Sequence, residues 1–187
     1  MKALILLTAI PFFLASGLMA QTCREVLRDS SGRIVQAIER QKQAGGAERA
    51  VTRDASGRIT GTAATRPNPG GSAHTEYRDA SGRITGTAST RPTTGSSSQT
   101  TYRDASGRIQ GSGDTRIQGG SGSGTTTQYR DASGRITGSS ATSVSPSGSH
   151  TGTQRDASGR IVGTSSGNGK CQKPGPVPLP PPTVAKK

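Results

Sequence analysis

The chain has 187 residues, a formal net charge of +13, no tryptophan and only 3% aromatic residues. Both phenylalanines, Phe12 and Phe13, lie within the first twenty residues, so little remains to build a conventional hydrophobic core. This composition argues against a globular enzyme, and the basic excess predicts attraction to anionic surfaces.

Residues 1–20 have the pattern of a secretory signal peptide. Lys2 precedes a mostly apolar stretch from Ala3 to Leu14, and small residues then lead to a cleavage site expected after Ala20. The apolar stretch is too short for a membrane-spanning helix, which needs about 20 apolar residues. We therefore expect a mature protein that is exported to the periplasm, the cell surface or the medium.

A seven-residue phrase, Arg-Asp-Ala/Ser-Ser-Gly-Arg-Ile, then occurs six times, with starts 25, 25, 25, 27 and 25 residues apart. The copies span Arg28–Ile34, Arg53–Ile59, Arg78–Ile84, Arg103–Ile109, Arg130–Ile136 and Arg155–Ile161. A fixed period of this size is typical of a repeat protein, in which each unit is one supersecondary element. Because a repeat presents the same surface many times, and not one unique constellation, we expect no enzymatic activity and no cofactor.

Each phrase predicts a β-hairpin. Its aspartate favours a type I turn, since the carboxylate can accept hydrogen bonds from the backbone, and its glycine can take a positive φ. Threonine, tyrosine and isoleucine on either side favour strands. The expected turn residues are Asp54 and Gly57, Asp79 and Gly82, Asp104 and Gly107, Asp131 and Gly134, and Asp156 and Gly159.

One such unit buries too little apolar surface to fold alone. We therefore predict an all-β fold over residues 21–171, in which the hairpin repeats stack as a sheet or solenoid, and whose exposed edges would permit self-association. Spacers rich in Gly, Ser and Thr, such as Arg91–Ser98 and Gly119–Gly124, are expected to be flexible loops. The first spacer, Ile34–Lys42, instead fits a short helix that caps the array.

The two cysteines of the mature chain, Cys23 and Cys171, bracket the repeats. In an oxidising compartment this pair predicts a disulfide that ties the ends of the array together, while two thiols or links between molecules would fit the same sequence. No second cysteine stands near either one, and His74 and His150 are isolated, so no metal site is expected. Residues 172–187 are rich in proline and are expected to form a disordered spacer or a ligand for a protein partner.

The segment Tyr77–Thr85 resembles the YD repeat of bacterial Rhs proteins and teneurins, which runs Tyr-Asp-x-x-Gly-Arg-Leu-Thr. Gly82–Thr85 matches its second half, and Thr125–Tyr129 matches its threonine-rich approach to the next tyrosine. The chain departs from that pattern by an arginine between tyrosine and aspartate, such as Arg78. The resemblance covers about Leu27–Gly163 and implies hairpins that spiral into a sheet. Six units are too few for the cargo-enclosing shells of that family.

Two functions fit these features. The first is an exported structural or surface-interaction module of the bacterial envelope. The alternative is a protein that binds polyanions, such as lipopolysaccharide, acidic polysaccharide or extracellular DNA, through a ladder of arginines: Arg58, Arg83, Arg108, Arg135 and Arg160. Since aromatic residues are scarce, sequence-specific binding of nucleic acid is not expected. Threonine pairs such as Thr85 and Thr87 would also suit a surface that binds ice or another crystal.

Overall fold

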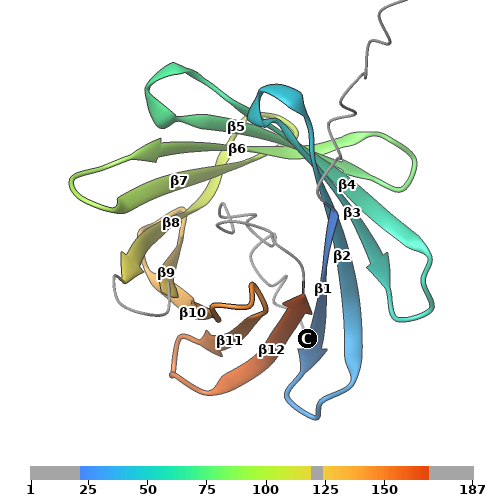
Figure 1. Cartoon of the computed structure of the whole chain (residues 1–187). Helices are drawn as coiled ribbons and strands as arrows, with labels where there is room; N and C mark the ends of the chain where they lie inside the picture. Colours follow the sequence, from blue (N-terminus) through green and yellow to red (C-terminus); the bar gives the residue numbers. More distant parts are fainter. Residues whose placement is uncertain (1–21, 119–123, 169–187) are drawn as a thin grey trace, which may run out of the picture.

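The computed structural model describes residues 22–118 and 124–168 (Figure 1). Within these ranges twelve antiparallel strands follow one another in chain order, and β1 pairs with β12, so the sheet closes into a barrel. The predicted all-β stack of hairpins is therefore confirmed, in the form of a barrel and not of an open sheet or solenoid. Closure pairs the backbone groups that an open stack would leave exposed at its two edges.

Each hairpin supplies two strands of seven to ten residues. The strands are β1 Thr22–Asp29, β2 Ile34–Lys42, β3 Glu48–Asp54, β4 Ile59–Pro67, β5 Ala73–Asp79, β6 Ile84–Pro92, β7 Ser97–Asp104, β8 Ile109–Gln118, β9 Gly124–Asp131, β10 Ile136–Val144, β11 His150–Asp156 and β12 Ile161–Asn168. Single 3-10 turns, η1 Ala44–Gly46 and η2 Pro69–Gly71, lie in the loops after β2 and β4. No helix in the part of the chain that the structure describes is long and apolar enough to cross a membrane.

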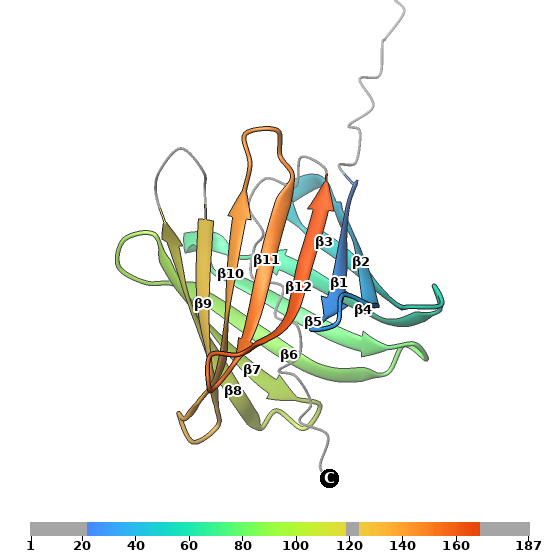
Figure 2. The same cartoon turned by 90° about the horizontal axis from the view of Figure 1, so that it is seen from below.

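The two ends of the barrel are built differently. All six phrases turn at one end, which we call the turn rim; it comprises residues 29–33, 54–58, 79–83, 104–108, 131–135 and 156–160. The loops that join successive hairpins lie at the opposite end, which we call the loop rim. Figure 2 shows this separation, with the β9–β10 and β11–β12 turns at one end and the β10–β11 loop at the other.

The predicted helix over Ile34–Lys42 is wrong, because this segment is strand β2. It pairs with β1 along one edge and with β3 along the other. Two complete ladders of hydrogen bonds outweigh the weak helical preference of this short sequence. The alternation of a strand also directs Ile38 into the interior, where it is only 2% exposed.

Part of each predicted flexible spacer is strand. Arg91 and Pro92 belong to β6, and Ser97 and Ser98 belong to β7, which leaves only four residues between the two strands. Gly124 opens β9, while residues 119–123 lie outside the described part of the chain. Serine and threonine suit these strands because β-branched and small polar residues fit a half-exposed pleated surface.

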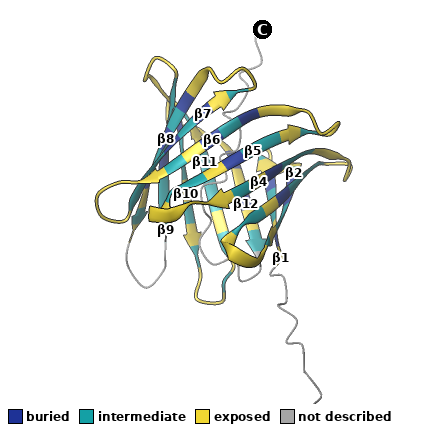
Figure 3. Cartoon of the chain, turned by 90° about the horizontal axis from the view of Figure 1, so that it is seen from above, coloured by how far each residue is buried: buried dark blue, intermediate teal, exposed yellow. Residues whose placement is uncertain are grey.

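Small side chains line the barrel interior. The apolar part of the core is a cluster of Leu27, Ile38, Ala50 and Ala63, against which Tyr77 packs. Threonines complete the same inner face, and Thr100 is 1% exposed. Figure 3 places the buried residues in the middle of the strands, with exposed residues at both rims.

From the second phrase onward, the glycine two positions after the isoleucine has a packing role, illustrated by Gly86. It faces the carbonyl oxygen of Arg103 on the neighbouring strand, and a Cβ atom added at Gly86 would clash with that oxygen. The same contact recurs between Gly61 and the carbonyl of Arg78. Successive hairpins can therefore approach closely only because this position has no side chain.

Candidate functional site

In each phrase, the carboxylate of the aspartate holds the turn through hydrogen bonds. In the third hairpin, Asp79 Oδ1 accepts hydrogen bonds from Ser81 N at 2.9 Å, Ser81 Oγ at 2.6 Å and Arg83 N at 3.0 Å. Gly82 has a φ of +83° and donates its N–H to Asp79 O at 3.0 Å. The backbone bonds to the aspartate recur in all six turns, so each predicted pair of Asp and Gly lies where a turn forms.

These hydrogen bonds favour the charged form of the turn aspartates. The hydroxyl of Ser81 lowers the pKa of Asp79 most, followed by the backbone N–H of Arg83. At Asp104 the largest cause of the lowered pKa is the backbone N–H of Arg108 instead. Each turn therefore presents a backbone of fixed shape and an ionised carboxylate whose oxygen is already bonded.

The first arginine of each phrase is tied to its own turn. Arg78 Nη1 donates to the carbonyl oxygen of Gly82 at 2.7 Å, and equivalent bonds of 2.8–3.0 Å occur in the other five turns. Arg78 also pairs with Glu76 at 2.7 Å on the outer wall. This arginine therefore fixes the turn and is already engaged in the folded protein.

The second arginine of each phrase differs from the first because its side chain is not bonded to the turn. Its backbone N–H bonds to the turn aspartate, while its side chain is exposed and, among the described residues, makes no hydrogen bond or ion pair. The structure places all five arginines of the predicted ladder at this position: Arg58, Arg83, Arg108, Arg135 and Arg160. Arg33 is the sixth member, which the prediction omitted. Because the barrel closes, the ladder is a ring of cationic groups around the turn rim.

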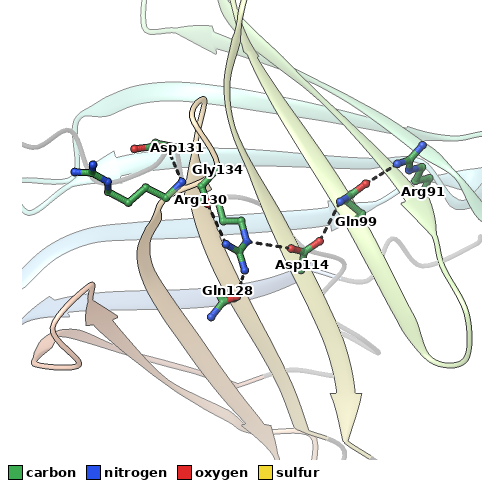
Figure 4. A network of polar contacts seen from close by, with 8 residues as sticks. Arg91, Gln99, Asp114, Gln128, Arg130, Asp131 and Gly134 are labelled. Atoms are coloured by element: carbon green, nitrogen blue, oxygen red, sulfur yellow. Dashed lines mark hydrogen bonds and ion pairs between the residues drawn. The ribbon is translucent and has the colours of Figure 1, made fainter.

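A network of polar contacts on the outer wall leads to one of the six turns (Figure 4). Gln99 Oε1 accepts a hydrogen bond from Arg91 at 2.6 Å, and Gln99 Nε2 donates to Asp114 at 3.2 Å. Arg130 lies 3.7 Å from Asp114 and donates to Gln128 at 2.8 Å and, as in every turn, to its own glycine. The chain of contacts crosses β6 to β9 and ends in the 131–135 turn, so it couples neighbouring hairpins on the outer wall.

The isoleucine of each phrase is exposed. A core-poor repeat would be expected to bury its one large aliphatic residue, but these six side chains are 38–49% exposed: Ile34, Ile59, Ile84, Ile109, Ile136 and Ile161. A shift in register between the two strands pairs each isoleucine with the first arginine of its phrase, as in Arg78 and Ile84. Sequence pattern alone could not show this, because the shift changes the face on which the residue lies.

A polar cluster in the interior joins strands β1, β2, β3 and β11. Arg40 Nη2 lies 2.7 Å from Glu25 Oε2, and Arg40 Nη1 lies 3.6 Å from Glu48 Oε1. His150 Nε2 lies 4.0 Å from Glu25 Oε1. These residues come from the first, second and last hairpins, so the cluster spans the seam where the barrel closes.

Three tyrosines extend from β5, β7 and β9 into the same interior. Burial raises the pKa of Tyr77, Tyr102 and Tyr129. The charge of Arg40 acts against this rise at Tyr77, whereas Glu25 adds to it at Tyr129, so these two tyrosines lie within electrostatic reach of the ion cluster. Aromatic groups are thus turned inward, away from any ligand on the outer surface.

Two further predictions concern other positions. Cys23 lies buried in β1, whereas Cys171 falls outside the described residues, so the disulfide between them stays a prediction. Thr85 and Thr87 lie in β6 on the wall of a closed barrel, which is curved, whereas an ordered crystal surface is matched best by a flat ladder.

Over residues 22–118 and 124–168, no group of three or more His, Cys, Asp or Glu residues could hold a metal ion.

In comparisons with known proteins, no family model and no curated protein matches the chain.

Proposed function

We propose that this chain is an exported, non-enzymatic surface-interaction module that binds anionic material of the bacterial envelope through its turn rim. The observation that carries the proposal is the ring of six exposed second arginines, whose side chains make no hydrogen bond or ion pair among the described residues. Twelve arginines and six aspartates in the phrases leave a charge of +6 at this end, since 12 − 6 = 6. Charge of one sign concentrated on one face raises the local concentration of oppositely charged partners.

The loops of the loop rim differ in charge from the turns at the opposite end of the barrel. Its described loops, residues 43–47, 68–72, 93–96 and 145–149, contain no charged side chain. The cationic groups of the turns therefore lie at one end of the barrel, whereas the exposed arginines toward the other end, such as Arg66 and Arg116, lie on strands β4 and β8 and not in the loops. Regular spacing around a rigid ring also suits a repeating polyanion, because several weak contacts can form at once.

The outward face favours phosphate and carboxylate groups over nucleic-acid bases. Guanidinium groups form charge-assisted hydrogen bonds with both kinds of anion. The tyrosines, by contrast, lie in the barrel interior and cannot stack on bases from outside. Lipopolysaccharide and acidic polysaccharide are therefore the favoured polyanions, and extracellular DNA would be bound through its phosphates alone.

Binding to heparin, a soluble polyanion, tests the proposal. Replacing three ring arginines, Arg83→Gln, Arg108→Gln and Arg135→Gln, should weaken binding at low salt by at least tenfold and flatten its dependence on salt. A control variant removes the same charge from exposed arginines toward the loop rim that take no part in the outer network: Arg49→Gln, Arg66→Gln and Arg116→Gln. Equal losses in the two variants, or no binding by the unaltered protein, would refute the role of the turn rim.

The proposal also includes export of the chain and a disulfide between Cys23 and Cys171. Asn168 pairs with Arg24, one residue from Cys23, and Cys171 is the third residue after Asn168 in the chain. Three residues reach about 10 Å, which supports a bridge between Cys23 and Cys171 within one chain. Such a bridge would be stable in the oxidising compartment to which a signal peptide directs the protein.

Two further elements of the proposal concern the ends of the array and its origin. The proline-rich segment 172–187 would act as a spacer, with capture of a protein partner as the alternative. We also propose that the resemblance to YD repeats extends to hairpin geometry alone, since the six hairpins here close on themselves. Self-association by edge pairing has little support, because β1 and β12, which would form the edges of an open sheet, pair with each other.

A further inference from the structure

The exposed aliphatic residues of the barrel have an uneven distribution. Within the described residues, the large hydrophobic side chains that stand exposed are the six isoleucines of the phrase together with Val35 and Val162, each 38–49% exposed. Each isoleucine directly follows a turn, and Val35 and Val162 come one residue later, so all eight lie beside the turn rim. The outer wall elsewhere carries mainly Thr, Ser, Gln and charged residues. Exposed apolar groups confined to one end mark an interaction surface and are not scattered exceptions.

The same rim alternates aliphatic and cationic groups. Ile84 lies opposite Arg78 in the strand register, and Arg83 precedes Ile84 directly in the chain. The turn tip beyond them consists of Ala80 and Ser81, whose small side chains leave the isoleucine close to any flat surface that meets the rim. Because the phrase recurs six times, the arrangement forms a complete amphiphilic ring around the barrel.

We infer that the turn rim docks on an anionic lipid bilayer, with the arginines at the phosphate groups and the isoleucines inserted between the headgroups. This inference rests on the proposed function and names the partner of the same site. A soluble polyanion can use the arginines alone and leaves the isoleucines in water. A bilayer surface satisfies both, since it offers phosphate at the interface and an apolar layer directly beneath.

The size of the aliphatic contribution follows from the exposure. Fully burying an isoleucine strengthens an association roughly 10- to 150-fold, and somewhat under half of each side chain is still exposed at the rim. Each inserted isoleucine should therefore strengthen membrane binding about fivefold. Three of them should contribute on the order of a hundredfold, on top of the salt-sensitive contribution of the arginines.

Vesicle flotation with the full mature chain tests the inference. The unaltered protein should float with phosphatidylglycerol vesicles and remain behind with phosphatidylcholine vesicles. The triple variant Ile59→Thr, Ile84→Thr and Ile109→Thr keeps β-branched residues in the strands and should bind phosphatidylglycerol about a hundredfold more weakly, with heparin affinity unchanged within twofold. Ile117→Thr makes the same substitution near the loop rim and should leave vesicle binding unchanged.

A fluorescent variant measures insertion even if the triple variant folds poorly. The chain has no tryptophan, so Ile109→Trp introduces a single reporter at the rim. Its emission should shift to the blue on phosphatidylglycerol vesicles, while Thr101→Trp on the middle of the outer wall should not shift. An unshifted rim tryptophan on protein that is bound to vesicles would overturn the inference.

The outcomes separate this inference from the proposed function. Equal vesicle binding by the triple variant and the unaltered protein would mean that the arginines act alone, which overturns the inference. Binding to heparin without binding to phosphatidylglycerol vesicles would also overturn it, while the proposed function would stand. Binding to neither ligand would overturn both.

Discussion

Replacing Tyr77 by phenylalanine should stabilise the protein. Tyr77 Oη is buried, and no hydrogen-bond partner for it exists among the described residues. A buried hydroxyl without a partner costs about 1–3 kcal/mol, because its hydrogen bonds to water are lost on folding and not replaced. Phenylalanine keeps the ring that packs against the cluster of Leu27, Ile38, Ala50 and Ala63. We therefore expect Tyr77→Phe to raise the free energy of unfolding by about 1–2 kcal/mol.

Tyr129 provides the matched control for this substitution. Its hydroxyl lies 3.1 Å from Ser140 Oγ in the same interior. Tyr129→Phe removes that hydrogen bond and leaves the Ser140 hydroxyl without its partner, so it should lower the free energy of unfolding by about 1 kcal/mol. The two substitutions delete the same atom from the same barrel, yet they should act in opposite directions.

Urea denaturation followed by circular dichroism measures both effects. The midpoint should move up for Tyr77→Phe and down for Tyr129→Phe, with the slope unchanged, since neither variant alters the surface exposed on unfolding. A loss of stability in both variants would show that the Tyr77 hydroxyl has a partner in solution. The reasoning from an unsatisfied buried group would then be refuted.

Three other perturbations follow from the same contacts. Hydrogen bonds lower the pKa of Asp79 and its five counterparts below the ordinary value of 3.8, so they stabilise the fold above that pH. The free energy of unfolding, measured by urea denaturation, should therefore fall as the pH drops below about 4. A flat profile down to about pH 2 would contradict this. Gly86→Ala introduces a Cβ atom against the carbonyl of Arg103 and should cost about 1–3 kcal/mol in the same assay, whereas a neutral result would show that the hairpins can move apart. Reducing the predicted bridge between Cys23 and Cys171 should lower stability by at most about 5 kcal/mol, and free thiols found by mass spectrometry in the oxidised protein would exclude the bridge.

The hairpins could be predicted from the sequence because their cause is local. The contacts of Asp79 with Ser81 and Arg83 span at most four residues, so the chemistry that forms the turn is present in the phrase itself. Tyrosine, threonine and isoleucine beside the turn then favour strands whatever the rest of the chain does. The arginine ladder could be proposed for the same reason, since its spacing follows from the period of the repeat.

Only the tertiary structure decided how the hairpins assemble. The pairing of β1 with β12 joins residues such as Arg24 and Asn168, which lie far apart in the chain, and no local signal specifies that contact. The same pairing carries Glu25 and His150 to one interior cluster. Pairing with β1 on one side and β3 on the other also made Ile34–Lys42 a strand, because these two strands offered its backbone more hydrogen bonds than a short helix could keep.

The exposed isoleucines show most clearly what could not be predicted from the sequence. Hydrophobicity predicts burial, but the shift in register beside each turn pairs Ile84 with Arg78 and leaves it half exposed. The sequence by itself therefore determined the unit, its turn and its charge. The barrel determined which residues face outward together, since a face exists only after distant strands have paired and a one-residue shift reverses it.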